Sequence, residues 1–260
     1  MKKPIISIII PAYNEENYIF PCLKSIVEQD FPKKSYEIIV INNNSSDKTK
    51  EIIKNNFPKV RIVDEPKQGL VFARIRGVSE AKSKIIAFTD ADTEVSPKWL
   101  KTIYTTYQKY PDIAGIGIPA NLQPKNLLVF LFQPIANLGV IIFKVLPGYN
   151  FSFKKDVYLK CGGYSLSANF SEDLYISKKI KQFGRAFILK ENLVIASSRR
   201  YQNPGGFFNY AFKYLVSSLT ISLFDFSFFS LKPVIFKKQK SLLKLFARSG
   251  SKHRFPISNL

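Results

Sequence analysis

Asp90 and Asp92 are the residues whose types and spacing point most directly to chemistry. They follow an apolar run, 85–88, that is typical of a strand covered on both faces. Ligands of parallel sheets bind beyond the carboxyl ends of the strands, so both side chains would project into a binding crevice. Adjacent carboxylates repel each other unless they share a cation, and Mg²⁺ prefers one or two carboxylates together with phosphate oxygens. A solvated Asp-x-Asp turn is the alternative, because such tripeptides are frequent in loops.

Three further polar segments come directly after predicted strands. The strands and the segments that follow them are 5–10 with 11–16, 36–41 with 42–47, and 60–63 with 67–69. Because the carboxyl ends of parallel strands meet at one edge of a sheet, we expect these segments beside Asp90 and Asp92. Another polar segment, 171–173, opens a predicted helix instead.

Helical spacing of apolar residues alternates with these strands over the first hundred residues. Such alternation predicts the α/β class, with a mostly parallel, doubly wound central sheet and flanking helices. A further helix is predicted after Pro97, and the helix that begins at 171–173 is predicted to end at Gly184. Later strands are predicted at 113–118, 148–153, 186–189 and 194–197.

The composition limits the class of protein and its partners. The chain has 260 residues, enough for one large α/β domain or a domain with an appendage. Its 39 Lys and Arg against 19 Asp and Glu give a net charge of +20, which would attract nucleic acid, anionic lipid or phosphorylated small molecules. Cys22, Cys161 and His253 show no metal-ligand spacing, which argues against a disulfide scaffold or a zinc site. The amino-terminal residues lack the pattern of a signal peptide, so we expect an intracellular protein.

The last part of the chain differs from the rest in composition. Residues 127–146 are strongly apolar but are interrupted by polar residues, which favours a core or surface-lying helix over a membrane span. Residues 207–236 are aromatic and aliphatic, and basic residues cluster at 232–254. We therefore predict a catalytic domain at 1–204 and, at 205–260, an apolar and basic helical extension that contacts a membrane or a partner.

Four motifs, taken in order, resemble those of family 2 glycosyltransferases, which have the Rossmann-like GT-A fold. They are Pro11–Glu16, Asn42–Asp47, Asp90–Asp92 and Ser171–Asp173, and the resemblance covers about the first 200 residues. It implies a non-processive, inverting enzyme that moves one sugar from a nucleotide-sugar donor, linked to UDP, GDP or dTDP, to an acceptor hydroxyl.

The resemblance also assigns roles to individual residues. Asp92 would ligate Mg²⁺ or Mn²⁺ at the donor diphosphate, and Asp173, beside Glu172, would be the general base. We expect Asp173 to be ionised, because a helix amino terminus favours an anion; a capping role for both acids is the alternative. The donor would be bound by Pro11, Ala12, Tyr13, Glu15, Asn43, Lys67, Arg74, Asp90, Ala91 and Arg200.

Two positions depart from the family's pattern. Asn43 stands where the family usually has an acid of Asp-Asp-Gly-Ser, and an amide both donates and accepts hydrogen bonds, so the preferred base stays open. The processive members carry Gln-x-x-Arg-Trp, whereas residues 197–201 keep only the Arg, as Arg200, with Tyr201 in the aromatic position. This departure favours transfer of a single sugar.

The predicted partners follow from these features. The acceptor would be a lipid-linked sugar or a glycan, with peripheral contact at the cytoplasmic face of the membrane. We expect no nucleic acid partner, because the chain has no recognition motif for one. A nucleotidyltransferase of sugar phosphates and a non-enzymatic basic binding protein are the rival classes, and the first usually has a Gly-rich loop that 11–16 lacks.

Overall fold

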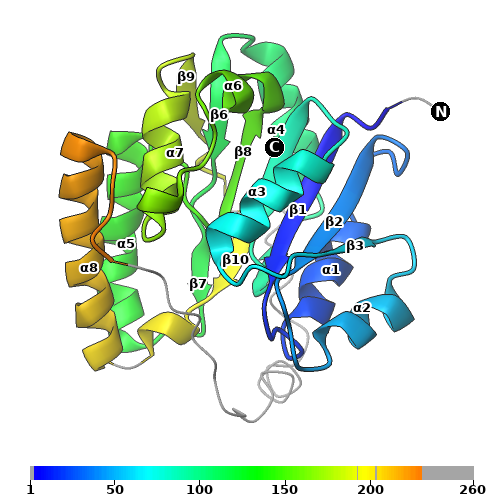
Figure 1. Cartoon of the computed structure of the whole chain (residues 1–260), viewed down its shortest axis with the longest axis horizontal. Helices are drawn as coiled ribbons and strands as arrows, with labels where there is room; N and C mark the ends of the chain where they lie inside the picture. Colours follow the sequence, from blue (N-terminus) through cyan, green and yellow to red (C-terminus); the bar gives the residue numbers. More distant parts are fainter. Residues whose placement is uncertain (1–2, 192, 203, 230–260) are drawn as a thin grey trace.

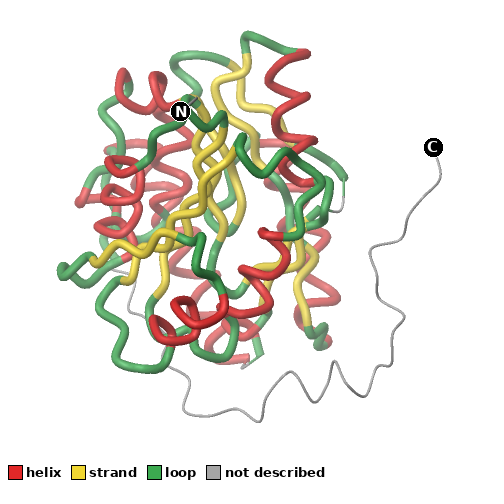
Figure 2. The backbone as a smooth tube through the Cα atoms, turned by 90° about the vertical axis from the view of Figure 1, so that its right-hand side faces the viewer, coloured by secondary structure: helices red, strands yellow, loops and turns green. Residues whose placement is uncertain are grey.

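The structure, a computed structural model, describes residues 3–191, 193–202 and 204–229, in which a central sheet is covered by helices on both faces (Figures 1 and 2). Seven strands lie in the order β3-β2-β1-β4-β8-β6-β9, and four of the six neighbouring pairs are parallel. The α/β class with a mostly parallel sheet is therefore confirmed. The strand bounds are β1 Ile6–Ala12, β2 Tyr36–Asn42, β3 Arg61–Asp64, β4 Ile85–Thr89, β6 Ile113–Gly117, β8 Asn150–Lys154 and β9 Arg185–Ile188.

Two apolar cores lie on the two faces of this sheet. Because successive side chains of a strand point to opposite faces, Ile8 and Ile10 of β1 join one core and Ile9 joins the other. The first core contains residues of α1, α2 and α4, and the second contains residues of α3, α6 and α7. The helix bounds are α1 Ile19–Val27, α2 Thr49–Asn56, α3 Leu70–Glu80, α4 Trp99–Lys109, α6 Lys155–Lys160 and α7 Glu172–Ile180.

Strand β8 runs against its neighbours. It pairs antiparallel with both β4 and β6, so that Asn150 at its start lies opposite Thr89 at the end of β4. The Asp90 N–H donates to the carbonyl oxygen of Tyr149, which precedes β8, at 3.2 Å. The antiparallel strand thus brings the turn before it to the same edge as Asp90.

A second sheet of three short strands lies beyond that edge. Its order is β5-β10-β7, with bounds Thr93–Val95, Val194–Ser197 and Asn121–Gln123. The sequence predicts β10, but it does not predict β5 or β7. The Ser197 N–H donates to the carbonyl oxygen of Asp92 at 3.1 Å. This sheet therefore carries the next element, the 3₁₀ helix η2 at Arg199–Tyr201, to the carboxylates.

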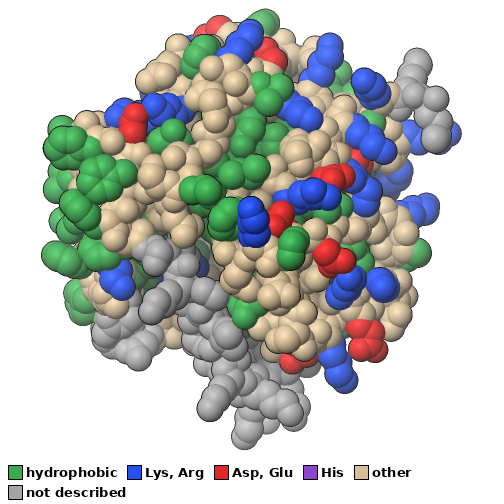
Figure 3. Space-filling model, in the orientation of Figure 1, with side chains coloured by type: hydrophobic (Ala, Val, Ile, Leu, Met, Phe, Trp, Pro, Cys, Tyr) green, Lys and Arg blue, Asp and Glu red, His purple; other side chains and the backbone are tan. Residues whose placement is uncertain are grey.

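Two helices expose apolar side chains, in contrast to the buried cores. They are α5, Leu127–Phe143, and α8, Pro204–Phe224, and hydrophobic side chains gather at the left of the molecule, where both helices lie (Figures 1 and 3). The surface position of α5 agrees with one of the two predicted alternatives. No helix within the described residues has the length and apolar character needed to cross a membrane. The predicted boundary between 204 and 205 falls at the start of α8 and stays a prediction, and residues 230–236 of the apolar segment lie outside the described residues. The exposed side chains include Leu127, Phe130, Leu131, Ile135, Leu138, Ile142 and Phe143 of α5, and Phe212, Leu215, Leu219, Leu223 and Phe224 of α8.

Candidate active site

The polar segments after β1 and β2 are joined to each other by hydrogen bonds. The Asn14 N–H donates to Ser45 Oγ at 3.1 Å, the Glu15 N–H donates to Thr49 Oγ1 at 2.8 Å, and the Ser46 N–H donates back to Asn14 Oδ1 at 2.8 Å. Asn14 has a left-handed backbone with φ of 55°, which Asn tolerates better than most residues. The two predicted donor-binding loops therefore form one continuous wall.

Asn43 is held inside the protein by its own amide. Its Nδ2 donates to the carbonyl oxygens of Glu65 and Lys67, at 3.0 and 2.7 Å, and its Oδ1 accepts from the Gly69 N–H at 2.8 Å. The side chain of Lys67 is exposed, and its ammonium lies 5.8 Å from the centre of the Phe72 ring. Asn43 thus fixes the loop before α3, a role that an Asp side chain could not fill because it cannot donate at pH 7.

Arg74 on α3 is a buried hub between two carboxylates. Its guanidinium lies 3.2 Å from Glu172 Oε1 and 3.7 Å from Asp90 Oδ1, and it donates to the carbonyl oxygen of Gly148 at 2.7 Å. The side chain is only 1% exposed. The sequence interpretation places Arg74 beside the donor diphosphate, but its charge is neutralised by protein groups. Donor binding by Arg74 stays a prediction that this geometry does not support.

Aromatic rings surround the Arg74 guanidinium. Its central carbon lies 5.4, 5.3 and 5.9 Å from the ring centres of Phe88, Phe151 and Tyr164. These residues come from β4, β8 and the segment before α7, so the arginine joins three parts of the chain. Such cation–π contacts stabilise a desolvated cation.

Arg199 forms a second hub, with Glu15 and Asp92. Its two terminal nitrogens donate to the two oxygens of Glu15, at 2.9 and 2.5 Å, and its Nε lies 3.0 Å from Asp92 Oδ2. The guanidinium also stacks on Tyr18, 4.7 Å from the ring centre. The sequence interpretation lets both arginines of the pair 199–200 face the diphosphate, with a solvated basic pair as the alternative, and it names only Arg200 as a site residue. The only signal was the adjacency of the two arginines.

Arg200, the next residue of η2, contacts helix α8. Its guanidinium lies over the Tyr210 ring of α8, 5.1 Å from the centre. Burial acts to lower the pKa of Arg200, but the net shift is upward because Tyr210, Tyr201 and the two acids Asp90 and Asp92 raise it. Arg200 is thus within electrostatic reach of the carboxylates that the sequence assigns to the donor.

Asp173 is oriented by two backbone N–H groups. Its Oδ2 accepts from Gly148 at 3.1 Å, and its Oδ1 accepts from Leu174 at 2.9 Å. Ser171, just before the helix, has a left-handed φ of 61°, a strained backbone of the kind found at functional sites. Burial raises the pKa of Asp173 above its ordinary value, although Arg74 and these N–H groups act in the opposite direction. The helix dipole alone predicts the opposite, a lowered pKa for Asp173, because it favours the anion.

Gly148 connects the base to the donor side of the site. Its carbonyl accepts from Arg74 while its N–H donates to Asp173. Burial likewise raises the pKa of Asp90, to about 6, against the effect of Arg74. The structure thus brings the predicted nucleotide contact, Asp90, and the predicted base into one hydrogen-bonded and ionic network.

The residues present fit a divalent cation that takes most of its ligands from a substrate. Among the described residues, no three Asp, Glu, His or Cys side chains converge on one point, which argues against an all-protein metal cage. Asp92 offers carboxylate oxygens at the site edge, and hard cations such as Mg²⁺ bind through one or two carboxylates with phosphate oxygens. Asp90 faces Arg74 and Asp92 faces Arg199, so the two acids have different partners.

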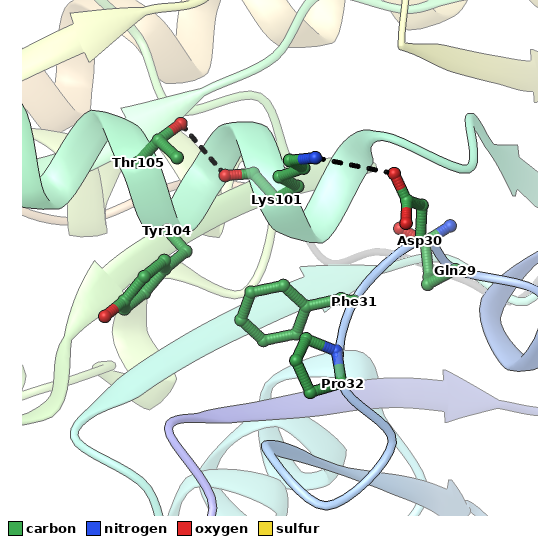
Figure 4. A pocket seen from close by; sticks show the side chains of 7 residues that line it. All are labelled: Gln29, Asp30, Phe31, Pro32, Lys101, Tyr104 and Thr105. Atoms are coloured by element: carbon green, nitrogen blue, oxygen red, sulfur yellow. Dashed lines mark hydrogen bonds and ion pairs between the residues drawn. The ribbon is translucent and has the colours of Figure 1, made fainter.

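A separate hollow of about 510 Å³ lies away from these groups (Figure 4). Lys101 and Asp30 form an ion pair across it at 3.6 Å, and the Phe31 ring lies 5.6 Å from that of Tyr104. None of the predicted site residues lines this hollow, so it is not the predicted donor site. Its lining residues are Gln29, Asp30, Phe31, Pro32, Lys101, Tyr104 and Thr105.

Solved structures with this fold define the class. The mannosyltransferase PcManGT from Pyrobaculum calidifontis, in complex with GDP-Man and Mn²⁺, matches with a TM-score of 0.70 over 85% of this chain and 65% of its own, at 18% identity. TarS 1-349 of S. aureus, in complex with UDP-GlcNAc, matches with a TM-score of 0.63 over 83% of this chain and 66% of its own, at 19% identity. The fold is the GT-A fold of glycosyltransferases.

The family follows from the sequence match. Residues 7–152 match the family model described as Glycosyl transferase family 2, a stretch that begins within β1 and includes β2 to β4 with Asp90 and Asp92. The chain belongs to glycosyl transferase family 2. The suspected family is thereby confirmed, and with it the prediction of an enzyme of the transferase class.

Curated relatives extend further along the chain. A glucuronosyltransferase of Methanococcus voltae, named for a dolichyl N-acetyl-glucosaminyl phosphate, is 29% identical over 218 residues, 76% of this chain and 64% of its own length. The poly(ribitol-phosphate) beta-glucosyltransferase of Bacillus spizizenii is 25% identical over 219 residues, 72% of this chain and 34% of its own. The chain thus spans about a third to two thirds of these relatives.

Proposed function

We propose that this chain is an inverting, non-processive glycosyltransferase that moves one sugar from a nucleotide-sugar to an acceptor hydroxyl. The observation that carries the proposal is the network in which Arg74 and Gly148 connect Asp90, at the tip of β4, with Asp173, at the start of α7. Family membership supports the same chemistry over nucleotidyl transfer.

The donor side of the site would bind the nucleotide and its diphosphate. The wall formed by the loops after β1 and β2, with Tyr13, would hold the nucleoside, and Asp90 would orient it. Asp92 would hold Mg²⁺ or Mn²⁺, and Arg200 lies within electrostatic reach of the same place. A bound divalent ion supplies a Lewis acid that stabilises the charge developing on the leaving diphosphate.

Asp173 would take the proton of the acceptor hydroxyl. The Gly148 and Leu174 N–H groups fix its carboxylate, which limits the directions from which an acceptor can approach. Its raised pKa makes it a stronger base than an exposed carboxylate. The deprotonated oxygen would then attack the anomeric carbon as the bond to the diphosphate breaks, and a single displacement of this kind inverts the configuration.

The nucleotide is best identified by binding. The solved neighbours include complexes with UDP-GlcNAc and with GDP-Man, which support UDP and GDP donors as the first candidates. A thermal-shift panel of UDP-, GDP- and dTDP-sugars, with and without Mn²⁺, tests this because a ligand of the folded state raises its apparent stability. The matching donor should raise the melting temperature more with Mn²⁺ than without.

The acceptor would be a lipid-linked sugar at the cytoplasmic membrane face. The exposed faces of α5 and α8 contain no acidic residue, Lys125 and Lys144 flank α5, and the chain carries a net charge of +20. An apolar surface bordered by cations suits an anionic bilayer. The dolichyl-linked compound in the name of the M. voltae relative supports such an acceptor.

Vesicle flotation tests this membrane contact. Phe212→Glu and Leu219→Glu on α8 should reduce binding to anionic vesicles, while Leu159→Glu on α6, which replaces an equally exposed apolar residue, should not. Absence of wild-type binding to anionic vesicles would overturn the membrane assignment. Self-association that the α8 variants abolish would overturn it too, and would indicate that a second copy of the chain covers this surface.

Product analysis with a base variant tests the core of the proposal. Asp173→Asn should keep donor binding near the wild-type level but slow sugar transfer by roughly 10²–10⁴-fold, the usual contribution of a general base. Asp156→Asn, at an exposed carboxylate on α6, is the matched control and should transfer normally. Release of pyrophosphate in place of nucleoside diphosphate, or full transfer by Asp173→Asn, would contradict the proposal.

A further inference from the structure

We propose that Arg199 and a divalent metal ion are alternative partners of Asp92, so that Arg199 sets how weakly the site binds metal before the nucleotide arrives. The inference rests on the proposed function in one respect, the assignment of Asp92 as metal ligand. Arg199 lies beside Arg200, the residue in the arginine position of the family's motif, and is not itself that residue.

The geometry divides the Arg199 guanidinium between two acids. Nη1 and Nη2 face the two oxygens of Glu15, and Nε faces Asp92 Oδ2 at 3.0 Å. The side chains of Arg199 and Asp92 are 18% and 14% exposed, so solvent screens this contact only in part. Asp92 therefore holds one cation already, through Oδ2, an oxygen that a metal would also use.

When Asp92 exchanges Arg199 for a metal ion, Glu15 keeps its hydrogen bonds to Arg199. The fork of Nη1 and Nη2 on Glu15 is bidentate and does not depend on Asp92. Asp92 can then turn to a metal while Arg199 stays on Glu15 and on the face of Tyr18. Arg199 nevertheless remains close enough to repel a divalent ion, because like charges a few ångströms apart interact strongly near a protein surface.

In this arrangement the diphosphate supplies the negative charge that offsets the repulsion between Arg199 and a bound metal ion. A divalent ion bound at Asp92 lies beside the like charge of Arg199, whereas an ion that arrives with a diphosphate brings its own negative charge. Nucleotide-free metal binding should therefore be weak, and metal binding with nucleotide should be strong. The residue acts through Asp92 and is a positioning residue, not a catalytic one.

Mn²⁺ titration of the full chain without nucleotide, followed by the electron paramagnetic resonance of free Mn²⁺, tests the proposal. Arg199→Gln should bind Mn²⁺ roughly tenfold more tightly than wild type. Arg199→Lys keeps the charge and should stay within about twofold of wild type. Arg185→Gln removes one charge from an exposed pair with Asp112 and should also leave the affinity unchanged. Unchanged or weaker Mn²⁺ binding by a folded Arg199→Gln would overturn the proposal.

A double variant identifies the carboxylate that gains the ion. Asp92→Asn with Arg199→Gln should lose the tighter binding, because Asp92 is the ligand; retention of the gain would assign the ion to another acid and overturn the proposal. Thermal unfolding of every variant establishes that it is folded. Sugar transfer by the same wild-type preparation tests the proposed function separately, so its absence overturns that function while the Mn²⁺ isotherms alone decide on Arg199.

Discussion

Two arginines each hold two carboxylates at the same end of the sheet, but their surroundings differ. Arg74 contacts Asp90 and Glu172, and Arg199 contacts Asp92 and Glu15. The two acids of one Asp-x-Asp motif are thus divided between two cations. Arg74 is fully enclosed by aromatic rings and backbone, whereas Arg199 lies at the rim on a single tyrosine.

The difference indicates which pair is fixed and which is exchangeable. A buried ion pair is costly to break, because removal of one partner leaves an unpaired charge that water does not reach. A partly exposed pair is replaced at lower cost, since solvent or another ion compensates the remaining charge. We therefore infer that the Arg74 cluster is part of the framework and that the Arg199 cluster is the place where a ligand enters.

The largest expected effect is on stability. Arg74→Gln should lower the free energy of unfolding by about 3–5 kcal/mol, because Glu172 and Asp90 would lose their buried partner. Arg199→Gln should lower it by a smaller amount, because its side chain is 18% exposed, against 1% for Arg74. Urea denaturation followed by circular dichroism measures both. Equal losses in the two variants would remove the distinction between a fixed and an exchangeable cluster.

Local sequence signals were sufficient for most of the sheet. The runs of β-branched and apolar residues at β1, β2 and β4 predict strands because both faces of these strands are buried, as with Ile8 and Ile9. The direction of β8 was not predicted, since it depends on pairing with β4 rather than on its own residues. β5 and β7 have three residues each and are formed by contact with β10, which no local pattern reveals.

The site was predictable where it is carried by motifs and not where it depends on burial. Asp90, Asp92 and Asp173 are found at the strand and helix ends that the sequence indicates. No local pattern indicates that Arg74 is enclosed, because its aromatic neighbours converge from separate elements. Arg199 pairs with a glutamate 184 positions away, and such a distant contact has no local signal.

The second expected effect separates the two acids of the motif. Asp92→Asn should weaken Mn²⁺-dependent nucleotide binding at least roughly tenfold and leave metal-free binding nearly unchanged, because a metal ligand is lost. Asp90→Asn should weaken nucleotide binding with and without Mn²⁺, because Asp90, which faces Arg74, is proposed to contact the nucleotide and not the metal. Calorimetric titration before and after treatment with EDTA measures the difference, with Asp156→Asn as control. The same metal dependence in both variants would show that the acids share one role.

The smallest expected effect is a pH dependence that comes from the Arg199 cluster. Burial raises the pKa of Glu15 from 4.5 to about 7, although Arg199 acts to lower it. The folded chain therefore binds a proton at Glu15 more tightly than the unfolded chain does. The contribution of this group to stability is greatest below pH 4.5 and is lost as the pH rises toward 7.

Glu15→Gln isolates that contribution because glutamine does not titrate. The wild type should lose stability between pH 5 and pH 7, and the variant should lose less, by a difference on the order of 1 kcal/mol. Asp90, Glu172 and Asp173 also have raised pKa values, so some slope should remain in the variant. Urea denaturation at a series of pH values measures the two slopes. Identical slopes would mean that Glu15 stays ionised against Arg199 throughout this range, and the rim pair would then be as permanent as the Arg74 cluster.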